Sequence, residues 1–212
     1  MSVLNNKTVL VLAPHTDDGE LGCGGSIAKY CSEGVSVYYV AFSICSRSLA
    51  PGEAPDTLAK EVALATSILG VKKENLILFD FDVRRFPEFR QEILEEMIKL
   101  RNKINPDIVF VPSPTDIHQD HQVISEEGLR AFKNTTVFGY EMPWNNIAFN
   151  TRSFIRLEEE HVKKKVDALL EYKSQRYRSY LSENFIRSLA KIRGVQIGSE
   201  NAEAFEVIRL IM

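Results

Sequence analysis

Short apolar runs alternate with helical patterns from the start of the chain to about residue 142. Runs rich in β-branched and aromatic residues predict strands at Val9–Ala13, Val35–Phe42, Leu76–Phe81, Asp107–Pro112 and Thr136–Met142. Apolar positions at helical spacing predict helices at Ser26–Glu33, from Asp56 to Gly70, from Pro87 onward and from about Gln119. This alternation is typical of βαβ units, so we predict an α/β, Rossmann-like fold with a mostly parallel sheet and flanking helices.

The rhythm changes after Pro143. Two short strands are predicted at Phe154–Leu157 and Phe205–Ile211, and two charged amphipathic helices lie between them at Glu158–Arg176 and Ser182–Ile192. We interpret this part as a C-terminal extension of helices and short strands, and residues 1–212 as a single domain.

Composition narrows the class of protein. The formal net charge of −3 gives no electrostatic footprint for nucleic acid, and no apolar run approaches the ~18 residues of a membrane span. The N-terminus lacks a secretory pattern, and Cys23, Cys31 and Cys45 form no CxxC pair, which predicts reduced thiols in the cytoplasm. A homo-oligomer is compatible with the sequence.

The first predicted strand leads directly into candidate chemistry. Pro14 ends the apolar run, and His15, Asp17 and Asp18 follow before a cluster of glycines. In an open α/β sheet, ligands bind beyond the carboxyl ends of the strands. An imidazole beside carboxylates suits a divalent metal such as zinc.

A second polar group follows the fourth predicted strand. His118 and His121 are three residues apart, so both rings project from the same face if this turn is helical, and Asp120 lies between them. The first and fourth strands of a doubly wound sheet are typically neighbours, so we expect the two groups to meet. They supply His, Asp and His as metal ligands with a fourth position for water, but the residues alone leave open which of Asp17 and Asp18 is the ligand and which is free to act as a base. The remaining histidine, His161, is interpreted as a solvated helix position.

The two segments PHTDDGELGCGG and SPTDIHQDH resemble the signature motifs of the LmbE/PIG-L family of metal-dependent N-deacetylases, and IRGVQIGSENAEAF is similar to the family's closing segment. The family has a Rossmann-like fold and typically removes acetyl groups from N-acetylglucosamine-containing compounds. Its first motif usually reads His-Pro-Asp-Asp-Glu. Here Thr16 replaces the proline and Gly19 the glutamate, and Glu20 comes one place later.

The resemblance also implies roles for the site residues. It implies that zinc, or another divalent metal, is held by His15, Asp18 and His121. Asp17 matches the general base, and His118 matches the histidine that assists the tetrahedral intermediate. Asp120 matches the carboxylate that orients His118, where it would raise the pKa of the imidazole by accepting its other N–H.

Substrate contacts are expected in the loops that follow the strands. Candidates are Arg47, Arg84, Arg85 and Trp144, because an arginine can pair with a phosphate or carboxylate and a tryptophan can stack on a sugar. The expected partner is a small N-acetylated sugar conjugate.

Three other functions compete with this interpretation. A dinucleotide-dependent oxidoreductase is disfavoured because the glycines do not match GxGxxG and the second strand lacks the acidic residue that would bind a ribose. A deacylase or amidohydrolase of a non-sugar amide stays open, as does a non-catalytic protein that binds a metal or a sugar.

Overall fold

The computed structural model describes residues 7–50 and 52–211. Within them one sheet has the strand order β3-β2-β1-β4-β5-β7-β6. The strands are β1 (Thr8–Ala13), β2 (Ser36–Ala41), β3 (Leu76–Leu78), β4 (Ile108–Pro112), β5 (Thr136–Tyr140), β6 (Ser153–Leu157) and β7 (Asn201–Arg209). Strands β1 to β5 pair in parallel, and β7 runs antiparallel to both β5 and β6. The predicted α/β fold is confirmed, and β1 and β4 are neighbours as expected.

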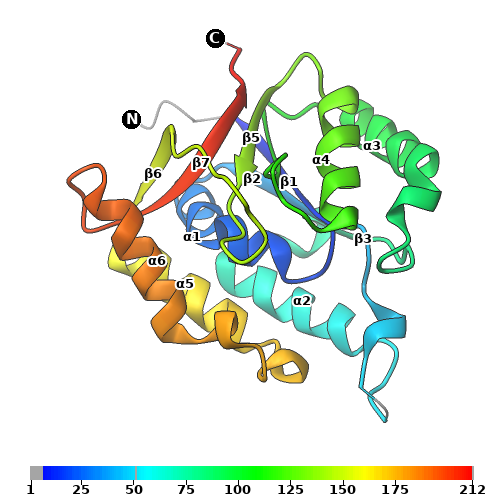
Figure 1. Ribbon diagram of the computed structural model, residues 1–212, viewed down its shortest axis with the longest axis horizontal. Helices are drawn as coiled ribbons and strands as arrows, with labels where there is room; N and C mark the ends of the chain where they lie inside the picture. Colours follow the sequence, from blue (N-terminus) through cyan, green and yellow to red (C-terminus); the bar gives the residue numbers. More distant parts are fainter. Residues whose placement is uncertain (1–6, 51, 212) are drawn as a thin grey trace.

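Helices cover both faces of this sheet. They are α1 (Asp18–Ser32), α2 (Thr57–Leu69), α3 (Arg90–Ile104), α4 (Gln119–Ala131), α5 (Glu159–Leu170) and α6 (Glu183–Val195). Short 3₁₀ turns lie at η1 (Ser46–Ser48), η2 (Lys73–Asn75), η3 (Phe86–Phe89), η4 (Lys173–Gln175) and η5 (Ser179–Leu181). In Figure 1, α3 and α4 lie on one side of the sheet, and α1, α2 and α5 lie on the other.

The two layers follow from side-chain alternation along β1. Val9, Val11 and Ala13 pack into one apolar cluster with residues of α1, α2 and α5. Leu10 and Leu12 point to the opposite face and join a second cluster with residues of α3 and α4. Because successive side chains of a strand alternate between faces, an apolar run that is buried on both sides predicts this arrangement. Within the described residues, no helix is long and apolar enough to cross a membrane.

The main difference from prediction is the start of the first helix. It was expected at Ser26 but begins at Asp18, so part of the first motif is helical. The glycines are required there by close packing, because a Cβ on Gly22 would lie 2.3 Å from the ring of Tyr140. The helix is broken once, at Cys23, whose φ of −145° and ψ of 23° are not helical.

A buried ion pair spans this break. Lys165 Nζ on α5 donates to the carbonyl oxygen of Leu21 and to Glu203 Oε1 on β7, each at 2.7 Å. The carboxylate of Glu203 also accepts the backbone N–H groups of Gly25 and Ser26, at 2.9 and 2.7 Å. One side chain therefore satisfies the end of the first helical segment and the other caps the start of the second.

Two further elements end three or more residues before their predicted ends. Strand β3 ends at Leu78 rather than Phe81, although single backbone hydrogen bonds continue beside β2. Helix α5 ends at Leu170 rather than Arg176. Tyr172 is fully buried just beyond this end, where its hydroxyl reaches the first motif.

Candidate metal and catalytic site

A cavity of about 500 Å³ opens at the carboxyl ends of β1 and β4. Its lining includes the predicted residues His15, Asp17, Asp18, His118 and His121. The two polar segments, about a hundred residues apart in the chain, therefore meet at one edge of the sheet as expected.

Three side chains offer a set of metal ligands. One ligand atom from each of His15, Asp18 and His121 lies within 4.8 Å of the others. Asp18 Oδ2 sits between the rings, 3.0 Å from Nδ1 of His15 and 3.2 Å from Nε2 of His121. Zinc–ligand bonds of about 2.1 Å in a tetrahedron separate neighbouring ligand atoms by roughly 3.4 Å. The two separations that involve Asp18 are therefore close to those of a tetrahedral zinc site.

The electrostatics of this set favour a cation. Burial alone would raise the pKa of Asp18, but the two neighbouring histidines hold it well below its usual range. Asp18 and Asp116 together raise the pKa of His121 to about 10, again against the effect of burial. A positive charge among these groups is thus stabilised, whether it is carried by a proton or by a metal.

Asp116 was missed by the sequence analysis. Its Oδ2 lies 2.7 Å from Nδ1 of His121, and its Oδ1 accepts the backbone N–H of His118 at 2.8 Å. Metal-binding histidines almost always direct their second nitrogen to such a carboxylate, which fixes the ring and leaves the other nitrogen free. The position of Asp116 five residues before His121 in the same motif was the available signal.

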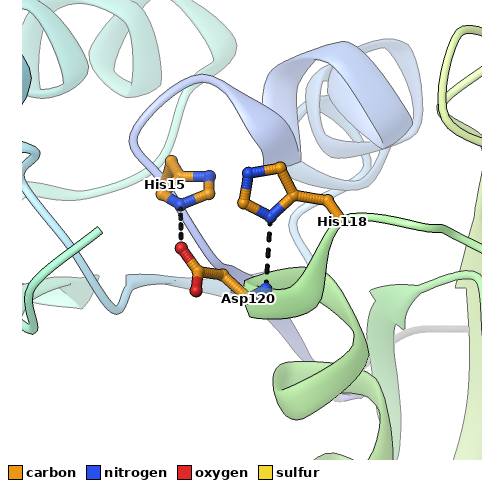
Figure 2. A group of neighbouring side chains, drawn as sticks. All are labelled: His15, His118 and Asp120. Carbon is orange, nitrogen blue, oxygen red and sulfur yellow. Dashed lines mark hydrogen bonds and ion pairs between the residues drawn. The ribbon is translucent and has the colours of Figure 1, made fainter. Parts of the chain in front are cut away.

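Asp120 lies elsewhere than expected. Its carboxylate is bonded to Nε2 of His15 at 3.0 Å, and no hydrogen bond joins it to the ring of His118 (Figure 2). It also accepts the backbone N–H groups of Arg84 and Phe86, at 2.5 and 3.2 Å. Because Asp120 lies in the first turn of α4, its side chain is directed towards those backbone donors. The predicted orientation of His118 by this carboxylate is therefore not present in the structure.

A second possible metal set combines His15, His118 and Asp120. Its carboxylate is already bonded to two backbone N–H groups and to the His15 ring. The set with Asp18 and His121 is favoured, because there the carboxylate oxygen is shared only with groups of the first motif and the partner histidine.

His118 caps the N-terminus of α4. Its Nδ1 accepts the backbone N–H of Asp120 at 3.2 Å (Figure 2). A neutral ring bonded in this way carries its proton on Nε2. Burial, followed by the charges of His121 and His15, lowers the pKa of His118 to about 4. Asp120 raises this pKa, as predicted, but burial and the two histidines outweigh it, and a ring with this pKa is neutral at pH 7.

Asp17 differs from its neighbour Asp18. It lines the cavity, and its carboxylate forms no ion pair with any residue in the described ranges. Burial and then the charge of Asp18 raise the pKa of Asp17 to about 6. The geometry thus distinguishes two adjacent carboxylates that the sequence alone could not distinguish. Asp18 lies between the histidines, and Asp17 forms no ion pair in the described part of the chain.

A buried network lies beneath the first motif. Tyr39 on β2 and Tyr172 both direct their hydroxyls to the carbonyl oxygen of Thr16 and to the carboxyl group of Glu20. Two hydroxyl protons leave two of these four contacts without a proton, and a proton on Glu20 would supply one of them. In agreement, burial raises the pKa of Glu20 to about 8. A Cβ on Gly19 would lie 2.5 Å from the Tyr39 ring, which explains a glycine at this place.

The predicted substrate residues divide into two groups. Arg84 and Trp144 line the cavity, whereas Arg47 and Arg85 do not. Arg47 pairs with Asp82 at 2.8 Å, and Arg85 pairs with Asp82 and Glu88. The lining residues from the C-terminal part were not anticipated, because they lie in the segment predicted as helix or just beyond it: Gln175, Arg178 and Tyr180.

Comparison with known proteins agrees with this geometry. The family model described as "PIG-L: GlcNAc-PI de-N-acetylase" matches residues 10–132, which contain both halves of the site. The chain belongs to this family. Membership of the PIG-L family places the chain among deacetylases. The matched residues end before the predicted closing segment at 192–205.

Individual relatives extend the similarity along the chain. The chain is 29% identical to the uncharacterized deacetylase YaiS of Escherichia coli K12, over 82% of this chain and 94% of that protein. It is 32% identical to the diacetylchitobiose deacetylase of Thermococcus kodakarensis, over 59% of this chain and 49% of that protein. The structure of the conserved protein TT1542 from Thermus thermophilus superposes with a TM-score of 0.77 at 26% identity, covering 96% of this chain and 95% of that one.

Proposed function

We propose that this protein is a zinc-dependent hydrolase that removes the N-acetyl group from an N-acetylglucosamine-like sugar conjugate. The observation that carries the proposal is the convergence of His15, Asp18 and His121 in a cavity that also presents the free carboxylate of Asp17. Membership of the PIG-L family supports a deacetylase, and the name of the Thermococcus relative favours an acetylated amino sugar as the substrate.

The metal would be held by His15, Asp18 and His121, with Asp116 orienting one ring and Asp120 the other. When bound, zinc supplies Lewis acidity, which polarises a carbonyl group and brings the pKa of water to ~7. Asp120 is thus proposed as a residue that positions His15.

Asp17 acts as the general base. It accepts a proton from the attacking water as the new C–O bond forms at the amide carbon. A pKa of about 6 suits this task, because the carboxylate is ionised at neutral pH and still basic enough to take the proton.

His118 stabilises the developing oxyanion. Its Nε2–H donates a hydrogen bond to the former carbonyl oxygen while the imidazole stays neutral. When the C–N bond breaks, the proton held by Asp17 passes to the leaving nitrogen. The products are acetate and the free amine.

The substitution Asp17→Asn tests the assignment. We expect kcat/KM for release of acetate from N,N'-diacetylchitobiose to fall by about 10²–10⁴ because the base is lost, with the zinc content unchanged. Asp18→Asn should instead lose the metal. A loss of zinc in Asp17→Asn, with zinc retained in Asp18→Asn, would exchange the two roles.

The dependence of kcat/KM on pH gives a second test. Since Asp17 must be ionised, activity should fall as the pH drops below about 6. His118 works in its neutral form and its pKa is about 4, so it should impose no loss between pH 6 and 8. A screen that includes non-sugar N-acetyl amides separates the sugar deacetylase from a general amidohydrolase, and a zinc-loaded protein that releases no acetate from any of them would be a binding protein.

A further inference from the structure

Arg178 lies in the cavity wall and has no role in the deacetylation mechanism proposed above. It lies between η4 and η5 and lines the same cavity as Asp17 and His118. Its Nε donates to Oε1 of Gln175 at 2.8 Å, and its Nη1 donates to the hydroxyl of Tyr180. These two bonds fix the plane of the guanidinium.

The support behind this guanidinium is rigid. The ring of Tyr180 stacks on Trp144 with centroids 4.1 Å apart and planes 9° from parallel. Trp144 also packs at 5.9 Å against Phe185 on α6. Trp144, itself packed against α6, therefore holds the Tyr180 partner of Arg178 in place, so little conformational entropy is lost when the guanidinium binds a ligand.

Arg178 also has N–H groups that donate to no acceptor within the described residues. A guanidinium carries five N–H groups, and within residues 7–50 and 52–211 only Gln175 and Tyr180 accept hydrogen bonds from Arg178. The negative charge of Asp17 acts on Arg178 in the same cavity, but without a direct hydrogen bond or ion pair between the two side chains. By contrast, Arg47 and Arg85 outside the cavity are each paired with acidic side chains. Within the described residues, Arg178 thus presents a positive charge without a direct ion pair, and a free donor edge, at the wall of a polar cavity.

We propose that Arg178 binds an oxyanion, either carboxylate or phosphate, on the group attached to the sugar of the substrate. The proposal rests on the function proposed above and narrows its substrate to anionic conjugates. A planar fork of donors matches a carboxylate or a phosphate, and the cavity is large enough to hold both an amino sugar and a substituent.

Trp144 is the only tryptophan of the chain, so its fluorescence reports directly on this corner of the cavity. The zinc-loaded protein would be titrated with N-acetylglucosamine 1-phosphate, with the N-acetylglucosaminide of glycolic acid, and with the neutral methyl glycoside. We expect at least one anionic compound to bind about tenfold or more tightly than the methyl glycoside, as a charge-assisted bond provides. The two anionic arms show whether phosphate or carboxylate is preferred.

Arg178→Gln should abolish this preference, and Arg178→Lys should keep part of it. Arg176→Gln is the matched control, since it removes the same charge two residues away on an exposed side chain that does not line the catalytic cavity. The proposal is overturned if wild-type protein shows no preference for an anion, if Arg178→Gln retains the preference, or if Arg84→Gln rather than Arg178→Gln abolishes it.

Kinetics separate this proposal from the proposed function. If acetate is released, Arg178→Gln should raise KM about tenfold or more for the anionic substrate and less than twofold for the neutral one. An equal loss for both would show that Arg178 acts through Asp17 and would refute anion binding. If the anion preference depends on Arg178 but no acetate is released, the deacetylase proposal fails while the anion site stands.

Discussion

The two halves of the candidate metal site are held in place in different ways. The half that follows β4 is organised within a few residues, because Asp116 bonds to both His118 and His121 and the ring of His118 caps α4. The half that follows β1 depends on distant segments. Its loop carbonyl at Thr16 is held by Tyr172, which comes more than 150 residues later.

This difference shows which contacts fix the position of each candidate ligand. The break in α1 behind Asp18 is stabilised by Lys165 and Glu203, both from the C-terminal part of the chain. These residues lie outside the range 10–132 that matches the PIG-L family model. The C-terminal extension therefore supports the segment after β1 that carries the first half of the site. The second half is held in place mainly by local hydrogen bonds.

Lys165→Met should have the largest effect, because it leaves the buried carboxylate of Glu203 without its cation. We expect a loss of about 3–5 kcal/mol in the free energy of unfolding, measured by urea denaturation. Lys163→Met on the same helix removes only an exposed pair with Asp167 and should cost less than about 1 kcal/mol. Equal losses in the two variants would contradict the role assigned to the break in α1.

Asp116→Asn tests the local half. Loss of the charged partner of His121 should weaken zinc binding by about 10–100-fold without unfolding the protein. The measurement is a competition titration with a chelator. Unchanged affinity would mean that the ring of His121 is fixed by packing and not by this carboxylate.

Tyr172→Phe removes a hydroxyl that connects the C-terminal part to Thr16 and Glu20. The expected loss is about 1–2 kcal/mol, since one buried hydrogen-bond donor disappears and its acceptors stay. Thermal unfolding measures it. Tyr177→Phe, at an exposed ring nearby, is the control and should change stability by no more than about 0.5 kcal/mol.

Glu20→Gln should have the smallest effect at pH 5, within about 0.5 kcal/mol, because the amide replaces a protonated carboxyl group. The folded-state pKa of Glu20 is raised to about 8 from the usual 4.5. The folded protein then binds more protons than the unfolded chain between these values, so wild-type stability falls as pH rises from about 5 to 8. The variant should lack this contribution, and identical pH profiles would refute the protonated network.

Much of the fold, and the meeting of the two polar segments at one edge of the sheet, could be predicted from sequence. The buried run at Val9–Ala13 implied a central strand, and the polar groups after the first and fourth strands implied a shared site. The start of α1 was misjudged, because the glycines that disfavour a helix in isolation are tolerated where Tyr39 and Tyr140 pack against them. The partner of Asp120 was misassigned, because its direction depends on backbone N–H groups of a loop 34 or more residues away.

By itself the sequence determined the parallel core, the edge at which the site lies and the kinds of side chain that meet there, because apolar periodicity and ligand chemistry are local properties. Tertiary structure decided which of Asp17 and Asp18 lies between the histidines, that burial lowers the pKa of His118, and that Arg178 rather than Arg47 faces the cavity. Those outcomes depend on burial and on contacts between distant segments, which no short stretch of sequence contains.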